Sequence, residues 1–329
     1  MKISRTASRA ALGVAFAGAL ALAFDAPLYA QIYPAKNVTV IVPYPPGGGT
    51  DLFARVIAQD LARQFDKQII VDNRSGAGGN IGAEFVAKAP PDGYTILYTA
   101  SPIALSRVLS KTVRFDPQRD LRPISMTISI PLVLAVHPSL PVRNIKELIA
   151  LAKAKPGALT YSSSGPGASG HFTMELLNFM GGIDTRHVPY RGAAPALTSV
   201  ISGETHMAFL VPPLVQAHAA SGKLRAIAVS SRTRSSVFPN VPTAQEQGLR
   251  EFEALQWHGF FAPVTVADAV IQVLHGAVVK ALAGPEVKSR LAAEGASVVG
   301  SSPAEFAAFF RREIAKWTEI AKRAGVQPE

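Results

Sequence analysis

The sequence contains no cysteine among its 329 residues. This absence excludes disulfide bonds, thiolate metal sites, a cysteine nucleophile and the lipid-modified cysteine of a bacterial lipoprotein. Charged residues make up only 17% of the chain against 48% hydrophobic residues, a balance typical of a folded globular protein. After the N-terminal region, no apolar stretch reaches the roughly 20 residues that a membrane-spanning helix needs. We therefore expect a soluble globular protein without a lipid anchor.

The N-terminal region has the pattern of a secretory signal peptide. Lys2, Arg5 and Arg9 are followed by an apolar run at 10–24 and by a small residue, Ala30. A basic segment, an apolar core and a small residue before the cut are the three parts of such a signal. The alternative, a transmembrane anchor, is disfavoured because the run is too short. We predict cleavage after Ala30 and a periplasmic protein.

Acidic residues are outnumbered: 33 Lys and Arg stand against 23 Asp and Glu, a net charge of +10. A basic surface favours nucleic acid, an anionic membrane or small anionic ligands. No cluster of basic residues with interleaved aromatics is present, and export separates the chain from nucleic acid. Most Lys and Arg are scattered along helical patterns, where we expect them to be solvated. A small anionic ligand is the remaining partner class.

Short apolar runs alternate with helical patterns along the chain. In the first unit, strands at 38–42, 69–71 and 94–99 are separated by helices at 51–65 and up to Lys88. The order β-α-β-α-β predicts a parallel sheet with helices on both faces.

The pattern restarts near residue 132. This second unit has predicted strands at 132–136, 159–163, 187–189, 207–211 and 225–231, and predicted helices at 144–154, 169–180 and 195–202. A strand near Phe260 and two helices follow, the last from Pro303 to about Lys322. The two units form either two independent domains or two lobes joined by crossing strands, with the C-terminal segment returning to the first lobe. Periodicity alone allows both.

Two loops, 43–51 and 162–170, each combine a preceding strand, internal glycines and a following helix. The first N–H groups of a helix are unpaired and carry roughly half a positive charge, and glycines let this backbone approach an anion. The alternative is that both loops are ordinary turns, in which Gly and Ser are common. Because the loops belong to different units, we favour an anion held from both sides.

A third segment, 187–192, follows a short predicted strand. It brings Tyr190 and Arg191 into a loop that ends at Gly192, where a phenol and a guanidinium suit a carboxylate. The alternative is a surface arginine whose stem packs on Tyr190. The position just after a strand end favours a role in a cleft.

Catalytic and metal motifs are incomplete. Residues 165–170 match G-x-G-x-x-G but lack the acidic residue about twenty positions later that a dinucleotide site needs. Residues 167–171 miss the last glycine of a nucleophile elbow. The seven histidines show no metal-binding spacing.

An ordered set of short motifs resembles the Bug family of periplasmic receptors, which serve tripartite tricarboxylate transporters. The motifs are PYPPGGGTD at 43–51, GAGGNIG at 76–82, PDGYT at 91–95, SGPG at 164–167 with His171, PYRG at 189–192, VPT at 241–243, and Trp257 with Gly259 and Pro263. They extend over nearly the whole chain after the signal peptide.

This resemblance implies an α/β chain with a type II periplasmic-binding-protein fold: two α/β lobes that close on a ligand in the cleft between them. The second lobe is then inserted into the first, with a signal peptide at 1–30, lobe one at 31–124 and 232–329, and lobe two at 125–231. The family's ligands are mostly carboxylates, held by backbone N–H groups and waters. The resemblance further implies delivery to the membrane subunits of a transporter. The incomplete catalytic and metal motifs predict no catalysis and no metal site, and we also expect no cofactor and a monomer.

The resemblance also implies the binding residues. These are Tyr44, Gly47, Gly48, Thr50, Asp51 and Ser101 in lobe one, and Ser163, Ser164, Gly165, Gly167, Ser169, Tyr190, Arg191 and Gly192 in lobe two. His206 stands where the family usually has an acidic residue, and we expect it near the lobe-two cleft, favouring a more anionic ligand. Three alternatives to a transport receptor remain: an exported hydrolase of small esters, an orphan sensor and a structural protein.

Overall fold

The computed structural model describes residues 33–323 and 325. The predicted signal peptide lies outside the described residues. Residues from Lys36 onward form one compact unit, and this unit contains every helix and strand described below.

The first sheet has six strands in the order β11-β4-β10-β3-β1-β2. Its strands are β1 (Val38–Val42), β2 (Ile69–Asn73), β3 (Thr95–Ala100), β4 (Leu121–Pro131), β10 (Leu255–Pro263) and β11 (Ser297–Val298). β1 pairs in parallel with β2 and β3, as the sequence predicted, because the intervening helices return the chain to the same edge. β4, β10 and β11 are antiparallel additions, so the sheet is mixed.

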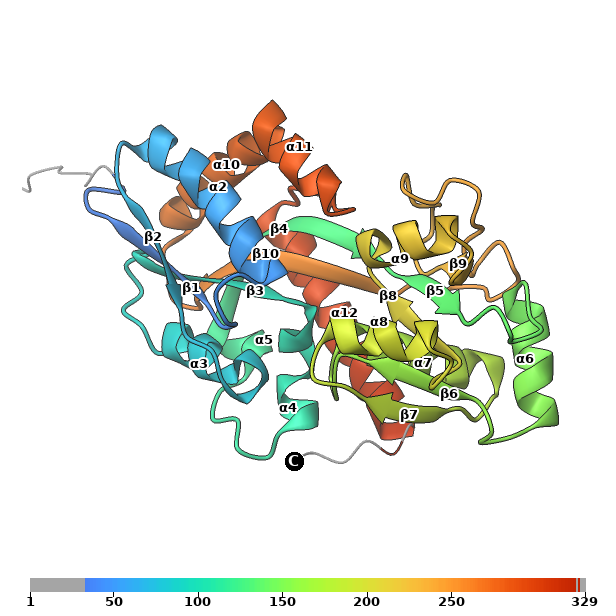
Figure 1. The fold of residues 1–329 in the computed structure, drawn as a ribbon. Helices are drawn as coiled ribbons and strands as arrows, with labels where there is room; N and C mark the ends of the chain where they lie inside the picture. The colour runs from blue at the N-terminus through green and yellow to red at the C-terminus, as the bar shows by residue number, and fades with distance from the viewer. Residues whose placement is uncertain (1–32, 324, 326–329) are drawn as a thin grey trace, which may run out of the picture. The chain divides into compact units, whose positions relative to one another are not determined.

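The helical elements around this sheet are α2 (Gly49–Phe65), η1 (Ala77–Gly79), α3 (Asn80–Ala87), η2 (Ser101–Leu105), α4 (Ser106–Leu109), α5 (Pro117–Asp120), α10 (Asp268–Ala283), α11 (Pro285–Ala293) and α12 (Pro303–Arg323). α2 buries Phe53, Ile57 and Leu61, which recur at helical spacing. Helices lie on both faces of the sheet, with α2 and α10 on one face and α3 and α5 on the other (Figure 1).

The second sheet has five strands in the order β7-β6-β8-β5-β9. Its elements are β5 (Val133–Val136), α6 (Ile145–Ala154), β6 (Thr160–Ser163), α7 (Ser169–Gly181), β7 (Arg186–Pro189), α8 (Ala193–Ile201), β8 (Met207–Leu210), α9 (Pro212–Ala220) and β9 (Arg225–Val229). Alternate residues of β5 face opposite sides: Leu134 joins the core with Phe172 of α7, whereas Val133 joins a second core with Val200 of α8. The second sheet is therefore also covered on both faces.

Two crossing connections join the sheets. The chain leaves the first sheet at Pro131, the last residue of β4, and returns to it in β10 (Figure 1). The buried Ser230 holds both crossings together, because its Oγ accepts from the Leu132 N–H at 2.8 Å and donates to the Ala254 carbonyl at 2.5 Å. α10 packs on β4 and α2, so the C-terminal segment returns to the first lobe.

One predicted boundary needs correction. The first part of lobe one was predicted to end at residue 124, but β4 continues as a strand of the first sheet to Pro131. Neither β4 nor α9 was predicted from the sequence. The change of sheet comes at Leu132, between β4 and β5.

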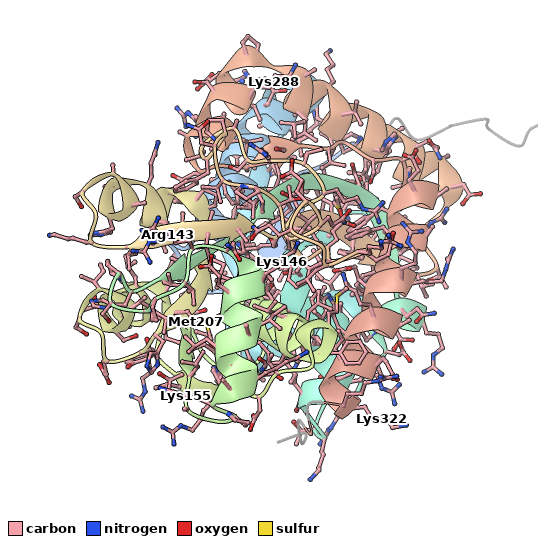
Figure 2. All side chains as sticks on the ribbon, turned by 90° about the vertical axis from the view of Figure 1, so that its right-hand side faces the viewer. Arg143, Lys146, Lys155, Met207, Lys288 and Lys322 are labelled. Atoms are coloured by element: carbon pink, nitrogen blue, oxygen red, sulfur yellow. The ribbon has the colours of Figure 1, made fainter. Side chains whose placement is uncertain are left out.

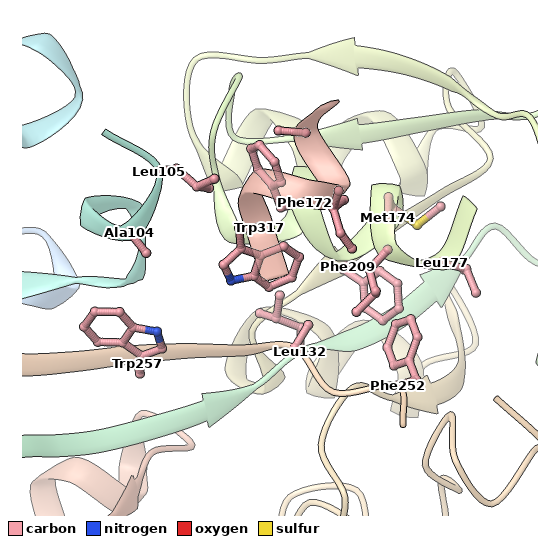
Figure 3. Packing of buried hydrophobic residues seen from close by; sticks show 14 of the residues in the cluster. Ala104, Leu105, Leu132, Phe172, Met174, Leu177, Phe209, Phe252, Trp257 and Trp317 are labelled. Atoms are coloured by element: carbon pink, nitrogen blue, oxygen red, sulfur yellow. The ribbon is translucent and has the colours of Figure 1, made fainter. Parts of the chain in front are cut away.

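The largest hydrophobic core is continuous through these crossings. Leu132, Phe172 and Trp317 lie close together, with Trp257 further along β10 (Figure 3). The rings of Phe172 and Trp317 meet edge to face at 5.8 Å, so α12 packs against α7 of the second lobe as well as β4 of the first. The buried carboxylate of Glu313 accepts from the indole N–H groups of both Trp257, at 3.2 Å, and Trp317, at 2.9 Å.

Basic side chains lie on the surface, as expected from their scatter in the sequence. Arg143, Lys146, Lys155, Lys288 and Lys322 are all exposed, and their side chains can be followed in Figure 2. Among the described helices, none alone is long and apolar enough to cross a membrane. The α10–α11 pair, bent by 73° at its break, meets that length and composition requirement jointly.

Candidate ligand-binding site

The loop between β1 and α2 leaves the first helical N–H groups open. Gly48 is the N-cap with an extended backbone (φ −75°, ψ 163°), and no side chain caps the helix. The first helical hydrogen bond runs from the Leu52 N–H to the Gly48 carbonyl at 3.0 Å. The N–H groups of Gly49, Thr50 and Asp51 precede this bond, so they belong to the unpaired first turn that attracts anions.

Asp51 has a different role from the one expected. Asp51 as a whole residue is only 2% exposed. It accepts from the Gly47 N–H at 2.9 Å, from Arg55 at 3.0 Å and from Asn73 at 3.0 Å. Burial would raise the pKa of this carboxyl, but these hydrogen bonds and the Arg55 charge outweigh burial and lower it. The Asp51 carboxylate is therefore ionised, and its oxygens are occupied by donors from the protein itself. One of these donors is the Gly47 N–H, so Asp51 helps to fix the conformation of the loop.

The loop between β6 and α7 repeats this arrangement in the second lobe. Ala168 is an extended N-cap (φ −64°, ψ 153°) without a side-chain cap, and the first helical bond runs from the Phe172 N–H to its carbonyl at 3.2 Å. The Gly167 N–H donates to Nδ1 of His171 at 3.2 Å, as the Gly47 N–H does to Asp51. Gly47 and Gly167 have nearly equal left-handed φ values of +82° and +79°.

A cavity of about 520 Å³ lies where these loops approach each other. Its lining residues come from loops of both lobes: Tyr44, Ala77, Gly78, Asn80, Pro102, Ser106, Leu109 and Ser110 from the first lobe, and Pro166, Gly167 and Ala168 from the second. These segments follow the carboxyl ends of β1, β2, β3 and β6, the edge at which ligands bind in open α/β sheets. No Lys, Arg, His, Asp or Glu is among them.

The lobes touch at two points beside the cavity. The hydroxyls of Ser101, after β3, and Ser169, at the start of α7, are 3.1 Å apart. Leu109 reaches Gly167 so closely that a Cβ added at that glycine would lie 2.5 Å from Leu109 Cδ1. Ser101 and Ser169 also line a small gap deeper between the lobes.

Tyr44 forms a wall of the cavity. Its hydroxyl is 3.4 Å from Thr99 Oγ1, and burial raises the pKa of its phenol above the ordinary value. The ring packs against Gly79, where an added Cβ would lie 3.3 Å from the ring. This contact explains a glycine at that position, and the phenol remains neutral as a hydrogen-bonding group.

The remaining predicted residues of lobe two lie around this loop. Ser163 ends β6 and accepts, through its carbonyl, from the Tyr190 N–H at 3.0 Å, which joins the 163–168 and 190–192 segments. Burial, and then the Glu204 carboxylate, raise the pKa of the Tyr190 hydroxyl. Arg191 is exposed and forms no ion pair within residues 33–323. Gly192 is the uncapped N-cap of α8, and Ser164 and Gly165 belong to the loop itself.

His206 does not lie in this region, contrary to expectation. Its Nδ1 accepts from the Thr160 N–H at 3.0 Å, and it directly precedes β8. Thr160 begins β6 whereas Ser163 ends it, so His206 lies at the amino-terminal ends of β6 and β8, about 10 Å along the strand from Ser163. The histidine that stands here in place of the family's usual acidic residue therefore lies away from the cavity.

Several residues that line the cavity were not predicted from the sequence. Ala77, Gly78 and Asn80 belong to a loop with the same signal as the two chosen loops: strand, glycines, helix. The connection through Ser106, Leu109 and Ser110 carries no glycine and gave no such signal. Within the described residues, no group of three or more His, Asp or Glu side chains is arranged to hold a metal ion.

Comparison with known proteins decides the family. The family described as "Tripartite tricarboxylate transporter family receptor" matches residues 53–326. Protein BugT of Bordetella pertussis is 36% identical over 304 residues, which cover 92% of this chain and 93% of BugT. The chain belongs to this receptor family.

Solved structures of relatives agree with the fold of this receptor. R. palustris Rpa4515 with adipate is 34% identical, with a TM-score of 0.76, and covers 90% of this chain and 100% of its own. The periplasmic binding protein BugD is 30% identical, with a TM-score of 0.73 over the same shares. MatC from Rhodopseudomonas palustris with bound malate is 29% identical, with a TM-score of 0.72, and covers 88% of this chain and 99% of its own. The receptor has the two-lobed fold of the periplasmic binding proteins, and it is a solute-binding receptor of their kind.

Proposed function

We propose that this receptor captures a small carboxylate between its lobes in the periplasm and delivers it to the membrane subunits of a tripartite transporter. In this proposal a signal peptide directs export and is cleaved after Ala30, and the mature receptor acts as a monomer. Family membership supports the transport role, and the adipate and malate bound to two relatives support the carboxylate.

One observation carries this proposal. Two helices from different lobes begin with extended, uncapped residues, Gly48 and Ala168. Ala168 itself and Tyr44, from the loop that leads to Gly48, line one cavity whose lining has no charged side chain. An anion there would be held by backbone N–H groups instead of an arginine or lysine. Four to six such bonds at about 1–2 kcal/mol each supply about 4–12 kcal/mol, a range that includes the roughly 8 kcal/mol of micromolar affinity.

The walls of the cavity bear on the body of the ligand. Pro102, Leu109 and Pro166 present apolar surface, while Tyr44 and Asn80 supply polar groups. Such walls favour an acid with a hydrocarbon body over one with hydroxyls at every carbon, because buried apolar surface gains about 25 cal/mol per Å².

The competing hydrolase function would require a nucleophile. Ser163 Oγ lies 2.7 Å from His187 Nε2, the distance of a Ser–His pair. However, Ser163 is only 1% exposed and its hydroxyl is already bonded to Gly165, so it cannot reach a substrate. Burial also lowers the pKa of His187 to about 4, which makes it a weak base at neutral pH. We therefore propose a receptor without catalytic activity.

A thermal-shift panel tests the proposal. It contains adipate, malate, citrate, benzoate and an amino acid, with a matched neutral amide of each acid as the control. An acid present at 100 times its Kd should stabilise the protein by about 2.7 kcal/mol, and its amide should not. No shift with any acid, or equal shifts with the amides, would overturn the carboxylate proposal.

A further inference from the structure

The loops at 43–51 and 162–170 contain the same internal hydrogen bond. In each, the third residue of the helix accepts from the N–H of the glycine just before the N-cap: Asp51 from Gly47, and His171 from Gly167. The two helices therefore begin alike, although the accepting side chains differ in charge. This bond occupies the glycine N–H in both loops, and in lobe two the N-cap N–H of Ala168 also donates to the Gly165 carbonyl at 3.2 Å. The donors left for a ligand in both lobes are therefore those of the first helical turn.

The lobe-one acceptor is a balanced carboxylate. Asp51 forms an ion pair with Arg55, four residues later on α2, and accepts a hydrogen bond from the Asn73 side-chain amide. Without Arg55, an ionised Asp51 beneath the loop would repel an anionic ligand. The guanidinium cancels this charge locally.

The lobe-two acceptor has no such counter-ion. Four residues after His171 stands Glu175, which accepts from the Tyr161 hydroxyl. A carboxylate at position 171 would therefore face another acid where Asp51 faces Arg55. A neutral imidazole supplies the acceptor without the charge.

A second histidine supports the first. The rings of His171 and His187 are stacked with centroids 4.0 Å apart and planes 8° apart, and His187 also stacks on Tyr161 at 4.9 Å. Two imidazolium ions at this separation would repel strongly in a buried site. Burial, and then the neighbouring His187, lower the pKa of His171 to about 3. Glu175 and Tyr161 are the other titratable groups beside the stack.

The hydrogen-bond partners assign the tautomers. His171 Nδ1 accepts from Gly167, so its proton is on Nε2. A serine hydroxyl has one donor and two acceptor sites. Ser163 Oγ donates to the Gly165 carbonyl and accepts from the Gly165 N–H, so its last site is filled by an N–H of His187 Nε2. Together the two histidines contact both ends of the 163–167 segment.

We propose that Asp51 and His171 are equivalent positioning residues that hold Gly47 and Gly167 so that the first-turn N–H groups of α2 and α7 point at the ligand, and that His187 supports His171. This inference rests on the proposed function. It concerns residues that do not touch the ligand and a structure that exists before the ligand binds.

The test compares two substitutions at one position. His171→Phe keeps a ring in the stack but removes the acceptor. His171→Asn removes the ring but returns an oxygen near the place of Nδ1. Amide hydrogen exchange at Gly167, measured by NMR without ligand, should accelerate about tenfold or more in His171→Phe and stay near wild type in His171→Asn. His171→Leu repeats the loss of the acceptor if the phenylalanine does not fit.

Affinity is the second readout, with adipate as the probe. We expect the Kd to rise about tenfold in His171→Phe and to be largely restored in His171→Asn, with unfolding midpoints of the two variants close together. Equal exchange at Gly167 in both variants would overturn the inference, even if wild type binds adipate well. Wild-type protein that binds no acid, with the exchange difference intact, would overturn the proposed function and leave the positioning role standing.

Discussion

Gly167→Ala probes both the loop and the contact between the lobes. Gly167 has φ +79°, a conformation that costs an L-residue about 1–2 kcal/mol. The added methyl would also lie 2.5 Å from Cδ1 of Leu109, so this side chain must move. Leu109 lines the cavity, and its displacement changes the space for the ligand.

The magnitude follows from these terms. Replacing glycine restricts the unfolded chain and returns about 0.4–1 kcal/mol, which offsets part of the backbone cost. With the added displacement of Leu109, we expect a net loss of about 1–2 kcal/mol in the free energy of unfolding, measured by urea denaturation. Adipate affinity should fall in parallel.

Gly48→Ala is the matched control. Gly48 has φ −75°, which any residue adopts, and an added Cβ would lie 3.5 Å from the Pro45 carbonyl oxygen, an ordinary contact. We expect its stability to change by no more than about 0.5 kcal/mol. Gly167→Ala combined with Leu109→Ala should recover the steric part of the loss and keep the backbone part.

Equal stability of Gly167→Ala and Gly48→Ala would refute this prediction. That result would mean that the 165–168 backbone rearranges freely and that its left-handed glycine is not required. A loss of stability without any change in affinity would refute only the link to the cavity.

Three further predictions concern other sites. Burial lowers the pKa of His258 to about 3, as it does for His171, whereas both titrate near 6.5 when unfolded. Their contribution to the free energy of unfolding is therefore complete above pH 6.5 and is lost as the pH falls toward 3, by about 2 kcal/mol each between pH 7 and pH 5. In urea denaturation at several pH values, His258→Phe should reduce this dependence of the unfolding free energy on pH. An unchanged pH dependence would contradict the prediction. Glu313→Leu should destabilise by about 2–5 kcal/mol because two buried indole N–H groups lose their acceptor, and Glu313→Gln by less, as chemical denaturation will show. His206→Asp should leave the adipate Kd within about twofold by titration calorimetry, since this side chain lies at the amino-terminal ends of β6 and β8, away from the cavity; a larger change would mean that the site extends there.

The strands of the first unit could be predicted because they are apolar and β-branched. β1 begins and ends as the sequence indicated, at Val38 and Val42, since a strand buried on both faces is a continuous apolar run. β4 was missed although Ile124, Met126 and Ile128 alternate with polar residues, the pattern of a strand. Its neighbours along the sheet, β10 and β11, come from distant parts of the chain, so nothing local indicated a pairing.

The candidate site shows the same limit. Glycine loops after strands could be found from local sequence, and Tyr44 and Gly167 do line the cavity. That Asp51 is saturated by Arg55 and Asn73 could not be predicted, because Asn73 arrives from the neighbouring strand. His206 was predicted near the cleft from a family motif. In the structure it comes just before the first residue of β8, at the end of the strand away from the cavity.

The most direct test of carboxylate capture is a crystal structure of the receptor with the acid that stabilises it most. The account predicts carboxylate oxygens within about 2.7–3.2 Å of first-turn N–H groups from both α2 and α7, with no lysine or arginine in contact. A ligand bound outside the cavity, or held by Arg191 instead of by these backbone groups, would contradict it.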